Sequence, residues 1–371
     1  MKLAIISHTE HYKTEDGTIV GWGPTISGIN NLANEFELIY HVAFFHEGTP
    51  PSSSLQYTEP NIIFIPLPPT GGKSLKGKLS VLFKMPRSIS IIRSILNKVD
   101  CFQVRTPLGM GVFLIPYLTF FSDKKGWYKY AGSWTLSNAP LAYRFQRWML
   151  KIQSRKVTIN GSWPNQLSHC LTFENPCLTK QERKDGETLV ESKSFSGPFS
   201  FCFVGRLEDE KGVHILIDAF SQLEDKTNIK SIELIGDGAE RSVYEKKAFE
   251  AELPFIFHGF LSRDKVFEMY KKCHFIVLPS QSEGFPKVIA EAMNFGCIPI
   301  VSDISSIGQY VNRENGYLIK NITASSLLNI FNEITATPEA ILKKKALLGY
   351  RITNKFTFEN YRNRVFNEIL N

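Results

Sequence analysis

The chain has 371 residues, of which 43% are hydrophobic and 21% are charged, so it is long enough for two domains and has an ordinary globular composition. No uncharged apolar stretch reaches the roughly 18 residues of a membrane-spanning helix, which argues against a membrane-embedded class. The net charge of +7 arises in residues 1–180, which hold 19 Lys and Arg against 10 Asp and Glu; no recognition motif accompanies this charge, which argues against nucleic-acid binding.

The amino terminus, MKLAIISHTEHYK, is interpreted as a first strand because its apolar run is short and no small-residue cleavage site follows. The six cysteines form no CxxC pair. Buried thiols in a reducing compartment explain them, and neither a disulfide framework nor a metal cluster is expected. We therefore expect a cytoplasmic protein.

Short apolar runs alternate with helical patterns through the first half of the chain. The predicted strands lie near residues 3–6, 37–42, 61–65, 100–104, 127–130, 157–160 and 171–173, and the predicted helices near 25–35, 79–97 and 139–151. The segment 180–198 is polar and poorly periodic, and we expect the domain boundary there.

The helix predicted at 79–97 belongs to a basic stretch, residues 73–98, which has seven basic residues and no acid: Lys73, Lys76, Lys78, Lys84, Arg87, Arg93 and Lys98. Two interpretations stay open. It is either an ordinary amphipathic domain helix with solvated bases, or a surface that contacts anionic lipid or an acidic acceptor.

Strand and helix patterns also alternate in the second half of the chain. Predicted strands at 199–204, 232–235, 255–257, 275–278 and 298–301 alternate with predicted helices at 213–223, 240–251, 264–272 and 286–295. This alternation predicts parallel sheets covered on both faces, hence an α/β protein with two Rossmann-like domains. Ligands of such folds bind at the carboxyl ends of the strands, so we expect a site in a cleft between two facing domains.

Glycine-rich turns mark several strand ends. "DGTIVGWGPT" at 16–25 places Gly21 and Gly23 before a predicted helix start, although a bare hairpin-like loop would need no ligand. "GDGAER" at 236–241 lacks the third glycine of a dinucleotide motif. "PTGGKS" at 69–74 is not a phosphate loop, because Leu67 stands where glycine is required.

Two further segments carry candidate site residues. In "FVGRLEDEKGVHIL" at 203–216, Gly205 permits close approach, and Arg206 and Lys211 before a helix would form an anion pocket suited to a diphosphate. The alternative is a pair of solvated bases balanced by the neighbouring acids.

In "SEGFPKVIAEAMNFGCIPIVSD" at 282–303, two acids, Glu283 and Glu291, flank a turn into a helix. Its backbone N–H groups are expected to point outward as donors; the turn residues are Gly284, Phe285, Pro286, Lys287 and Val288. The acids could instead complement the helix dipole, but Glu291 lies too far from the helix start for that role.

Taken together, "VGRLEDEKG", "ELIGDGAER", "FIFHGFLSRDKV", "SEGFPKVIAEAMNFGCIPIVSD" and "ENGYLI" at 314–319 resemble family 4 (group 1) of the retaining nucleotide-sugar glycosyltransferases. The resemblance implies the GT-B fold, with an acceptor-side domain at 1–180, a nucleotide-sugar-binding domain at 181–355 and a terminal helix at 356–371 that crosses back to the first domain.

The resemblance also implies roles for these residues. Arg206 and Lys211 would neutralise the donor diphosphate, so that no metal or other cofactor is expected. Glu283 and the amides that follow it would hold the sugar. Glu291 would hold the ribose, His258 would contact the nucleobase, and Gly23 would let the backbone of the first domain approach the diphosphate, beside Gly21.

One position departs from the family pattern. Family members often carry histidine near the end of the fourth strand, where "DCFQVRTPLG" offers Arg105 instead. Arginine cannot act as a base at neutral pH. We therefore assign Arg105 to binding donor phosphate or an acidic acceptor, with His8 as an alternative polar contact or a structural histidine.

The expected activity is transfer of a sugar from a nucleoside diphosphate to a lipid-linked or cell-surface polysaccharide or lipopolysaccharide precursor. The basic stretch 73–98 would bring the protein to the inner face of the cytoplasmic membrane as a peripheral protein. Two alternatives remain: a sugar-nucleotide epimerase on a similar two-domain fold, and a catalytically silent membrane-associated scaffold.

Overall fold

The computed structural model describes residues 1–71, 75–136 and 138–371. They divide into two compact units: unit 1 contains residues 1–174 and 361–371, and unit 2 contains residues 175–360. Unit 2 thus begins before the predicted boundary at 180/181, because Leu178 pairs with Thr357. The polar segment that we expected to be the boundary forms helix α6 (Lys180–Ser192), closed at its start by a capping box between Thr179 and Glu182.

Unit 1 is built on one nine-stranded sheet. Its strands are β1 (Lys2–Lys13), β2 (Ile19–Trp22), β3 (Leu38–Phe45), β4 (Ser54–Gln56), β5 (Ile62–Leu67), β6 (Cys101–Thr106), β7 (Lys125–Tyr130), β8 (Val157–Ile159) and β9 (Cys170–Thr172). Seven of them run parallel in the order β5-β3-β1-β6-β7-β8-β9. Strand β2 pairs antiparallel with β1, and β4 pairs antiparallel with β2. The order of the first strands is that of a Rossmann fold.

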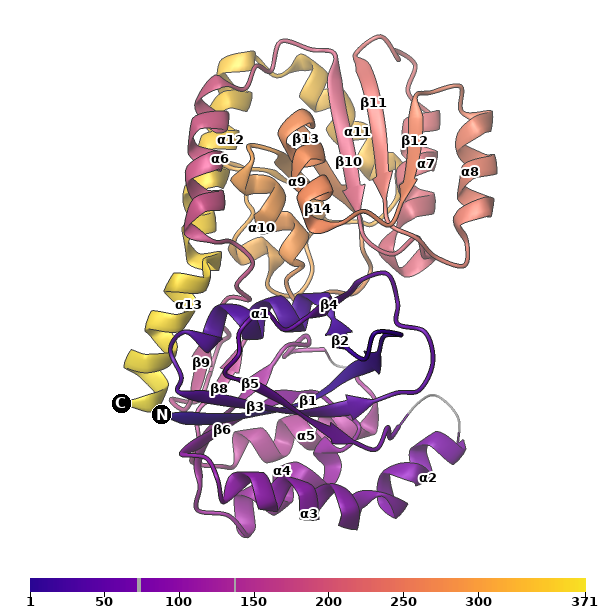
Figure 1. Cartoon of the computed structure of the whole chain (residues 1–371). Coiled ribbons are helices and arrows are strands. Elements are labelled where there is room, and N and C mark those ends of the chain that lie inside the picture. Colours follow the sequence, from indigo (N-terminus) through magenta and orange to yellow (C-terminus); the bar gives the residue numbers. More distant parts are fainter. Residues whose placement is uncertain (72–74, 137) are drawn as a thin grey trace. The chain divides into compact units, whose positions relative to one another are not determined.

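Helices cover both faces of this sheet because successive side chains of β1 point to opposite sides. Leu3 and Ile5 pack with α1 (Gly23–Ala33) and with Tyr361 of α13 (Phe358–Val365). Ala4 and Ile6 pack on the other side, against a layer formed by α2 (Leu75–Phe83), α3 (Met85–Leu96), α4 (Gly111–Phe120) and α5 (Leu141–Lys151). Figure 1 shows α1 on one face of the strands and α3, α4 and α5 on the other.

The elements of unit 1 differ from the predicted ones in several details. The helix expected at 79–97 is two helices, which meet at Lys84 just before Pro86 in the first turn of α3. The glycine-rich turn at 16–25 contains a hairpin strand, β2, before α1 begins at Gly23. Helix α4 was not predicted at all.

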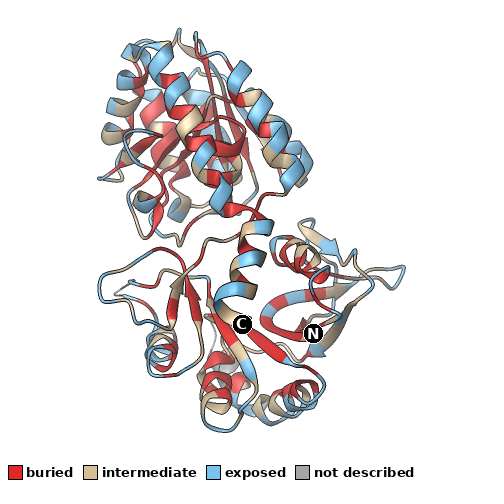
Figure 2. Ribbon diagram, turned by 90° about the vertical axis from the view of Figure 1, so that its left-hand side faces the viewer, coloured by how far each residue is buried: buried red, intermediate tan, exposed pale blue. Residues whose placement is uncertain are grey.

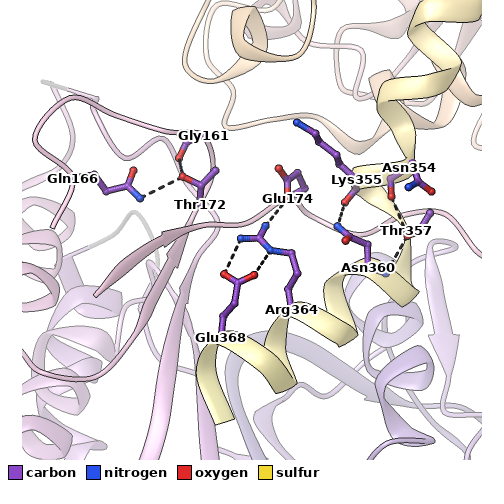
Figure 3. Close-up of polar contacts among 10 residues, drawn as sticks. All are labelled: Gly161, Gln166, Thr172, Glu174, Asn354, Lys355, Thr357, Asn360, Arg364 and Glu368. Atoms are coloured by element: carbon purple, nitrogen blue, oxygen red, sulfur yellow. Dashed lines mark hydrogen bonds and ion pairs between the residues drawn. The ribbon is translucent and has the colours of Figure 1, made fainter. Parts of the chain in front are cut away.

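The end of the chain is fastened to unit 1 by charge. Arg364 donates to Glu174 at 3.0 Å and to both carboxylate oxygens of Glu368 (Figure 3). On the preceding turn, the backbone N–H of Asn360 donates to Thr357 Oγ1, and the Asn360 side chain donates to the carbonyl of Lys355. The Arg364–Glu174 contact joins residues 361–371 to the rest of unit 1.

Unit 2 is a six-stranded parallel sheet in the order β12-β11-β10-β13-β14-β15. The strands are β10 (Phe199–Val204), β11 (Ile229–Ile235), β12 (Phe255–Gly259), β13 (Phe275–Leu278), β14 (Ile298–Ser302) and β15 (Tyr317–Ile319). Besides α6, its helices are α7 (Val213–Ser221), α8 (Arg241–Glu250), α9 (Arg263–Lys272), α10 (Lys287–Asn294), α11 (Ala324–Ala336) and α12 (Glu339–Ile352). The central strands are buried in both units (Figure 2), so the predicted α/β class with two Rossmann-like halves is confirmed.

Candidate functional site

The carboxyl ends of β10, β11 and β13 are crowded by their own loops. A side chain on Gly236, which has φ 137°, would lie 1.8 Å from the carbonyl oxygen of Gly205, and one on Gly212, at φ 75°, would lie 2.2 Å from that of Pro279. Both positions therefore require glycine. The loops consequently meet over one small region of the sheet edge, where ligands of parallel α/β sheets bind.

Lys211 and Glu283 meet in this region. Lys211 ends a short 3₁₀ helix (Asp209–Lys211) that follows β10, and Glu283 follows the neighbouring strand β13. The Lys211 ammonium nitrogen lies 2.5 Å from Glu283 Oε1, and the two side chains are only 20% and 15% exposed. The backbone N–H of Gln281 donates to the carbonyl of Glu210 and holds the two loops together.

Arg206 takes a different position. Its guanidinium is 69% exposed and lies 3.0 Å from Glu208. Such exposed pairs contribute at most about 1 kcal/mol, so Arg206 can exchange this partner for an anionic ligand at little cost. The exposure of Arg206 thus matches the alternative of a solvated base, whereas that of Lys211 does not.

The turn after Glu283 leads directly into α10, which begins at Lys287 with Pro286 preceding it. The first amides of a helix have no partner within the helix. Gly284 accepts a hydrogen bond from Ser306 Oγ at 3.1 Å. The Phe285 ring is buried against neighbouring aromatic rings, so only its backbone can contact a ligand.

Glu291 lies one turn inside α10 and is half-buried. Burial raises the pKa of Glu291 above its ordinary value, although the positive charges of Arg263 and Lys287 counteract part of this rise. Arg263 is itself held by Glu182 and by the carbonyl of Cys177. A carboxylate kept in such a setting is costly for folding, which is typical of binding sites.

His258 lies near the end of the edge strand β12, and one of its ring nitrogens is occupied. Nε2 lies 2.6 Å from a carboxylate oxygen of Glu233, a buried acid on the adjacent strand β11. A base contact by His258 would therefore use the ring face or Nδ1.

Gly21 and Gly23, the candidate glycines of unit 1, are required by local packing. A side chain on Gly21 would lie 2.6 Å from the ring of His11, and one on Gly23 would lie 2.5 Å from the carbonyl oxygen of Ser53. Close approach to a ligand remains a prediction for both.

The charge of Arg105 acts on the side chain of His8. Desolvation lowers the pKa of His8, and the positive charge of Arg105 lowers it further against the opposing effect of Glu10. Arg105, near the end of β6, donates from Nε to Gln103 Oε1 at 3.1 Å. A cation at this strand end suits an anionic ligand group.

A buried polar network beside these residues was not predicted. Ser7 Oγ lies 2.8 Å from His41 Nε2, His41 Nδ1 lies 2.6 Å from Tyr57 Oη, and Tyr57 Oη lies 2.8 Å from His11 Nε2. The available signal was the presence of histidines within strands, His8 and His11 in β1 and His41 in β3. Because each group has a partner, the network orders the interior of unit 1.

Within the described residues, no group of three or more His, Cys, Asp and Glu could hold a metal ion. In the same part of the chain, no helix is both long and apolar enough to cross a membrane.

Comparison with known proteins bears on the segment that holds Lys211 and Glu283. Residues 186–347 match the family model "Glycosyl transferases group 1". This segment lies within unit 2 and also contains Arg206, His258 and Glu291.

Curated relatives match the same half of the chain. The chain is 32% identical over 166 residues to an uncharacterized glycosyltransferase of Methanocaldococcus jannaschii, covering 44% of this chain and 46% of that protein. It is 29% identical over 184 residues to the lipopolysaccharide 1,2-N-acetylglucosaminetransferase of Salmonella typhimurium, covering 46% and 47%. The matches thus span about half the length of these relatives.

Solved structures match over nearly the whole chain. Anabaena HepE in complex with UDP and glucose has a TM-score of 0.69 at 16% identity, covering 99% of this chain and 98% of that one. The apo form of WaaB, a lipopolysaccharide outer core galactosyltransferase, has a TM-score of 0.68 at 18% identity and covers all of both chains. The predicted GT-B fold is confirmed by these likenesses.

Proposed function

We propose that this chain is a retaining glycosyltransferase that takes its sugar from a nucleoside diphosphate. The observation that carries the proposal is the Lys211–Glu283 pair at the carboxyl edge of the second sheet, within the segment that matches group 1 glycosyltransferases. The pair offers a cation for a phosphate and an acid for a sugar hydroxyl at one point. A donor with both groups side by side fits it.

Each end of the donor has candidate partners in unit 2. Lys211 and the exposed Arg206 bind the diphosphate, and Gly205 leaves room for it at the end of β10. Glu283 and the backbone from Gly284 to Val288 bind the sugar hydroxyls. Glu291 accepts hydrogen bonds from the ribose, and His258 contacts the nucleobase.

The chemistry follows from charge development. As the bond between the anomeric carbon and the phosphate oxygen breaks, negative charge grows on the departing diphosphate, and Lys211 stabilises that charge more strongly than it stabilises the bound donor. The same phosphate oxygen takes the proton of the acceptor hydroxyl while the acceptor oxygen bonds to the anomeric carbon on the face that the diphosphate leaves. The anomeric configuration is retained. Arg206 and Lys211 supply the positive charge at the diphosphate that a metal ion would otherwise supply.

The acceptor that we propose is a lipid-linked or cell-surface polysaccharide or lipopolysaccharide precursor, handled at the inner face of the cytoplasmic membrane. The names of the Salmonella typhimurium relative and of WaaB support this choice. Unit 1 supplies Arg105 and His8 as polar groups for an acceptor, and Gly21 and Gly23 for the donor's approach.

The test uses NMR of the anomeric protons of a nucleotide sugar incubated with the full chain, with and without a membrane lipid extract as acceptor. We expect a stable donor without acceptor, and with acceptor a new glycoside that keeps the donor's anomeric configuration. Epimerised donor without acceptor would establish the epimerase instead. No conversion of UDP-, GDP-, ADP- or dTDP-sugars under either condition would contradict the proposal and favour the silent scaffold.

A further inference from the structure

The helical layer on one face of unit 1 carries no acidic side chain. None of the helices α2, α3, α4 and α5 contains Asp or Glu. From residue 61 to residue 173 the sequence has 16 Lys and Arg against two acids, Asp100 and Asp123. Lys73, in the basic stretch predicted from sequence, lies outside the described residues, but Arg87, Arg93 and Lys98 are exposed there.

Helix α5 turns apolar side chains toward solvent. Leu141 is 78% exposed and Trp148 is 55% exposed, and Phe145 and Ile152 are exposed as well. Spacings of four, three and four residues place all four on one side of the helix. The sheet side is already filled by Met149 and other buried residues, so these four contribute nothing to the core.

The apolar surface extends to the end of α4. Phe121 is 77% exposed and Phe120 beside it is also exposed. Arg155, four residues after the end of α5, donates to the carbonyls of Leu118 and Lys124 around the end of α4, which places the segment that follows α5 beside the end of α4. We call Phe120, Phe121, Leu141, Phe145, Trp148 and Ile152 the α5 patch.

Exposed bases flank the α5 patch. Arg144 and Lys151 lie on α5 itself, and Lys125 follows α4. A surface helix with aromatic and aliphatic residues on one side and Lys and Arg beside them is the pattern of helices that lie in a membrane interface. We propose that the α5 patch docks unit 1 on an anionic lipid bilayer, with the aromatic side chains entering the headgroup region and the bases contacting lipid phosphates.

The charges favour lipid over a second copy of the chain. Two α5 patches brought together would place bases against bases with no acid on the facing helices to compensate, whereas an anionic bilayer neutralises all of them. The inference relies on the surface of unit 1 and not on the proposed glycosyl transfer. It also centres the proposed membrane contact on α5 and not on residues 73–98, for which the sequence left a lipid contact open as one of two interpretations.

The test is co-sedimentation of the full chain with vesicles of phosphatidylcholine alone and of phosphatidylcholine with phosphatidylglycerol. We expect binding to the anionic vesicles only. F145S/W148S should weaken this binding at least about tenfold through lost apolar burial. R144Q and K151Q should each weaken it about fivefold, an effect that added salt reproduces.

The fluorescence of Trp148 also measures how deeply this side chain enters the bilayer. Brominated lipid in the anionic vesicles should quench Trp148 fluorescence, so that W148F binds but loses quenching, whereas W22F, at an exposed tryptophan on β2, keeps it. Urea unfolding of W148F, R144Q and K151Q should match that of wild type, because Trp148, Arg144 and Lys151 are exposed. The same measurement on F145S/W148S, in which Phe145 is only 37% exposed, establishes that the double variant is folded when its binding is compared. Equal binding to both vesicle types, unchanged binding of F145S/W148S, or a W148-dependent dimer without vesicle binding would each overturn the proposal.

Discussion

Lys211 and Glu283 hold each other in place at the carboxyl edge of the second sheet. Their 2.5 Å contact is largely shielded from water, so each charge compensates the other more strongly than in an exposed pair. Removing one partner leaves the other both unpaired and free to move. The two residues should therefore behave as one unit in catalysis.

We predict that Lys211→Met lowers kcat for sugar transfer by about 10²-fold or more, since it removes a cation that acts on the departing diphosphate. Glu283→Gln should lower kcat/KM to a similar extent, and the double variant should lose far less than the product of the two. Steady-state kinetics measure this, with Lys246→Met on exposed α8 as the matched control. Independent, multiplying losses would show that the pair does not act together.

The buried charge of Glu291 lowers the stability of the folded protein at neutral pH. Because burial raises the pKa of Glu291 in the folded protein, the folded state binds the proton more tightly than the unfolded state. Stability therefore falls as the pH rises from the ordinary carboxyl range through the raised value, and at neutral pH the charge opposes folding.

We predict that Glu291→Gln stabilises the ligand-free protein at neutral pH but weakens nucleoside diphosphate binding about tenfold to a hundredfold, because a charged acceptor for the ribose hydroxyls is lost. Urea unfolding and calorimetric titration give the two quantities. A variant that is both less stable and equally good at binding would mean that Glu291 is structural.

At the scale of elements, Lys193 ties helix ends of unit 2 together. Its buried ammonium follows α6 and donates to the carbonyls of Tyr270 and Cys273 at the end of α9, at 3.0 and 2.6 Å, and to that of Phe295 at the end of α10, at 2.7 Å. Carbonyls at a helix end lack partners within the helix. A cation there also complements the helix dipoles.

We predict that Lys193→Met lowers the free energy of unfolding by about 2–4 kcal/mol, because three buried carbonyls lose their donor. Lys184→Met, on the exposed side of α6, should stay within about 0.5 kcal/mol of wild type. Urea denaturation distinguishes them. Equal effects would show that Lys193 does not cap these helices.

The elements that the sequence predicted well are those whose pattern is local. Strands β10 and β13 were placed at their observed residues because buried parallel strands are short continuous apolar runs. Helix α4 escaped because it is apolar all round, and α6 because its residues are mostly polar. The apolar helix α4 therefore lacks the amphipathic period on which prediction depends, and the few apolar residues of α6 are too sparse to mark it as a domain helix.

The sequence could identify residues of the candidate site but not the contacts between them. Gly205, Lys211, Glu283 and Glu291 could be named from turn and charge patterns. That Lys211 touches Glu283 could not, because it depends on β13 lying beside β10, a pairing across about seventy residues. The burial of Phe285 and the histidine network of unit 1 depend on tertiary packing in the same way.

At the scale of the whole molecule, buried neutral histidines occur in both units. Burial lowers the pKa of His11 in unit 1 to about 4 and that of His274 in unit 2 to about 4, where the charges of Lys193 and Lys230 contribute. Burial also lowers the pKa of His41. The unfolded chain therefore binds more protons than the folded protein below about pH 6.5.

We predict that stability decreases as the pH falls from about 6.5 towards 5, by up to about 1.4 kcal/mol per pH unit for each such histidine. Urea denaturation across this range measures the slope, and His274→Gln should reduce it. A stability that is constant between these pH values would contradict neutral burial of these rings.

The proposed nucleotide-sugar site of unit 2 is tested most directly by thermal denaturation in the presence of saturating UDP-, GDP-, ADP- and dTDP-sugars. We predict that at least one donor raises the Tm of the wild-type chain, that this rise is smaller for Lys211→Met and Glu291→Gln, and that Lys246→Met keeps it in full. No stabilisation by any donor, or an equal rise for Lys211→Met, would contradict a nucleotide-sugar site at the carboxyl edge of the second sheet.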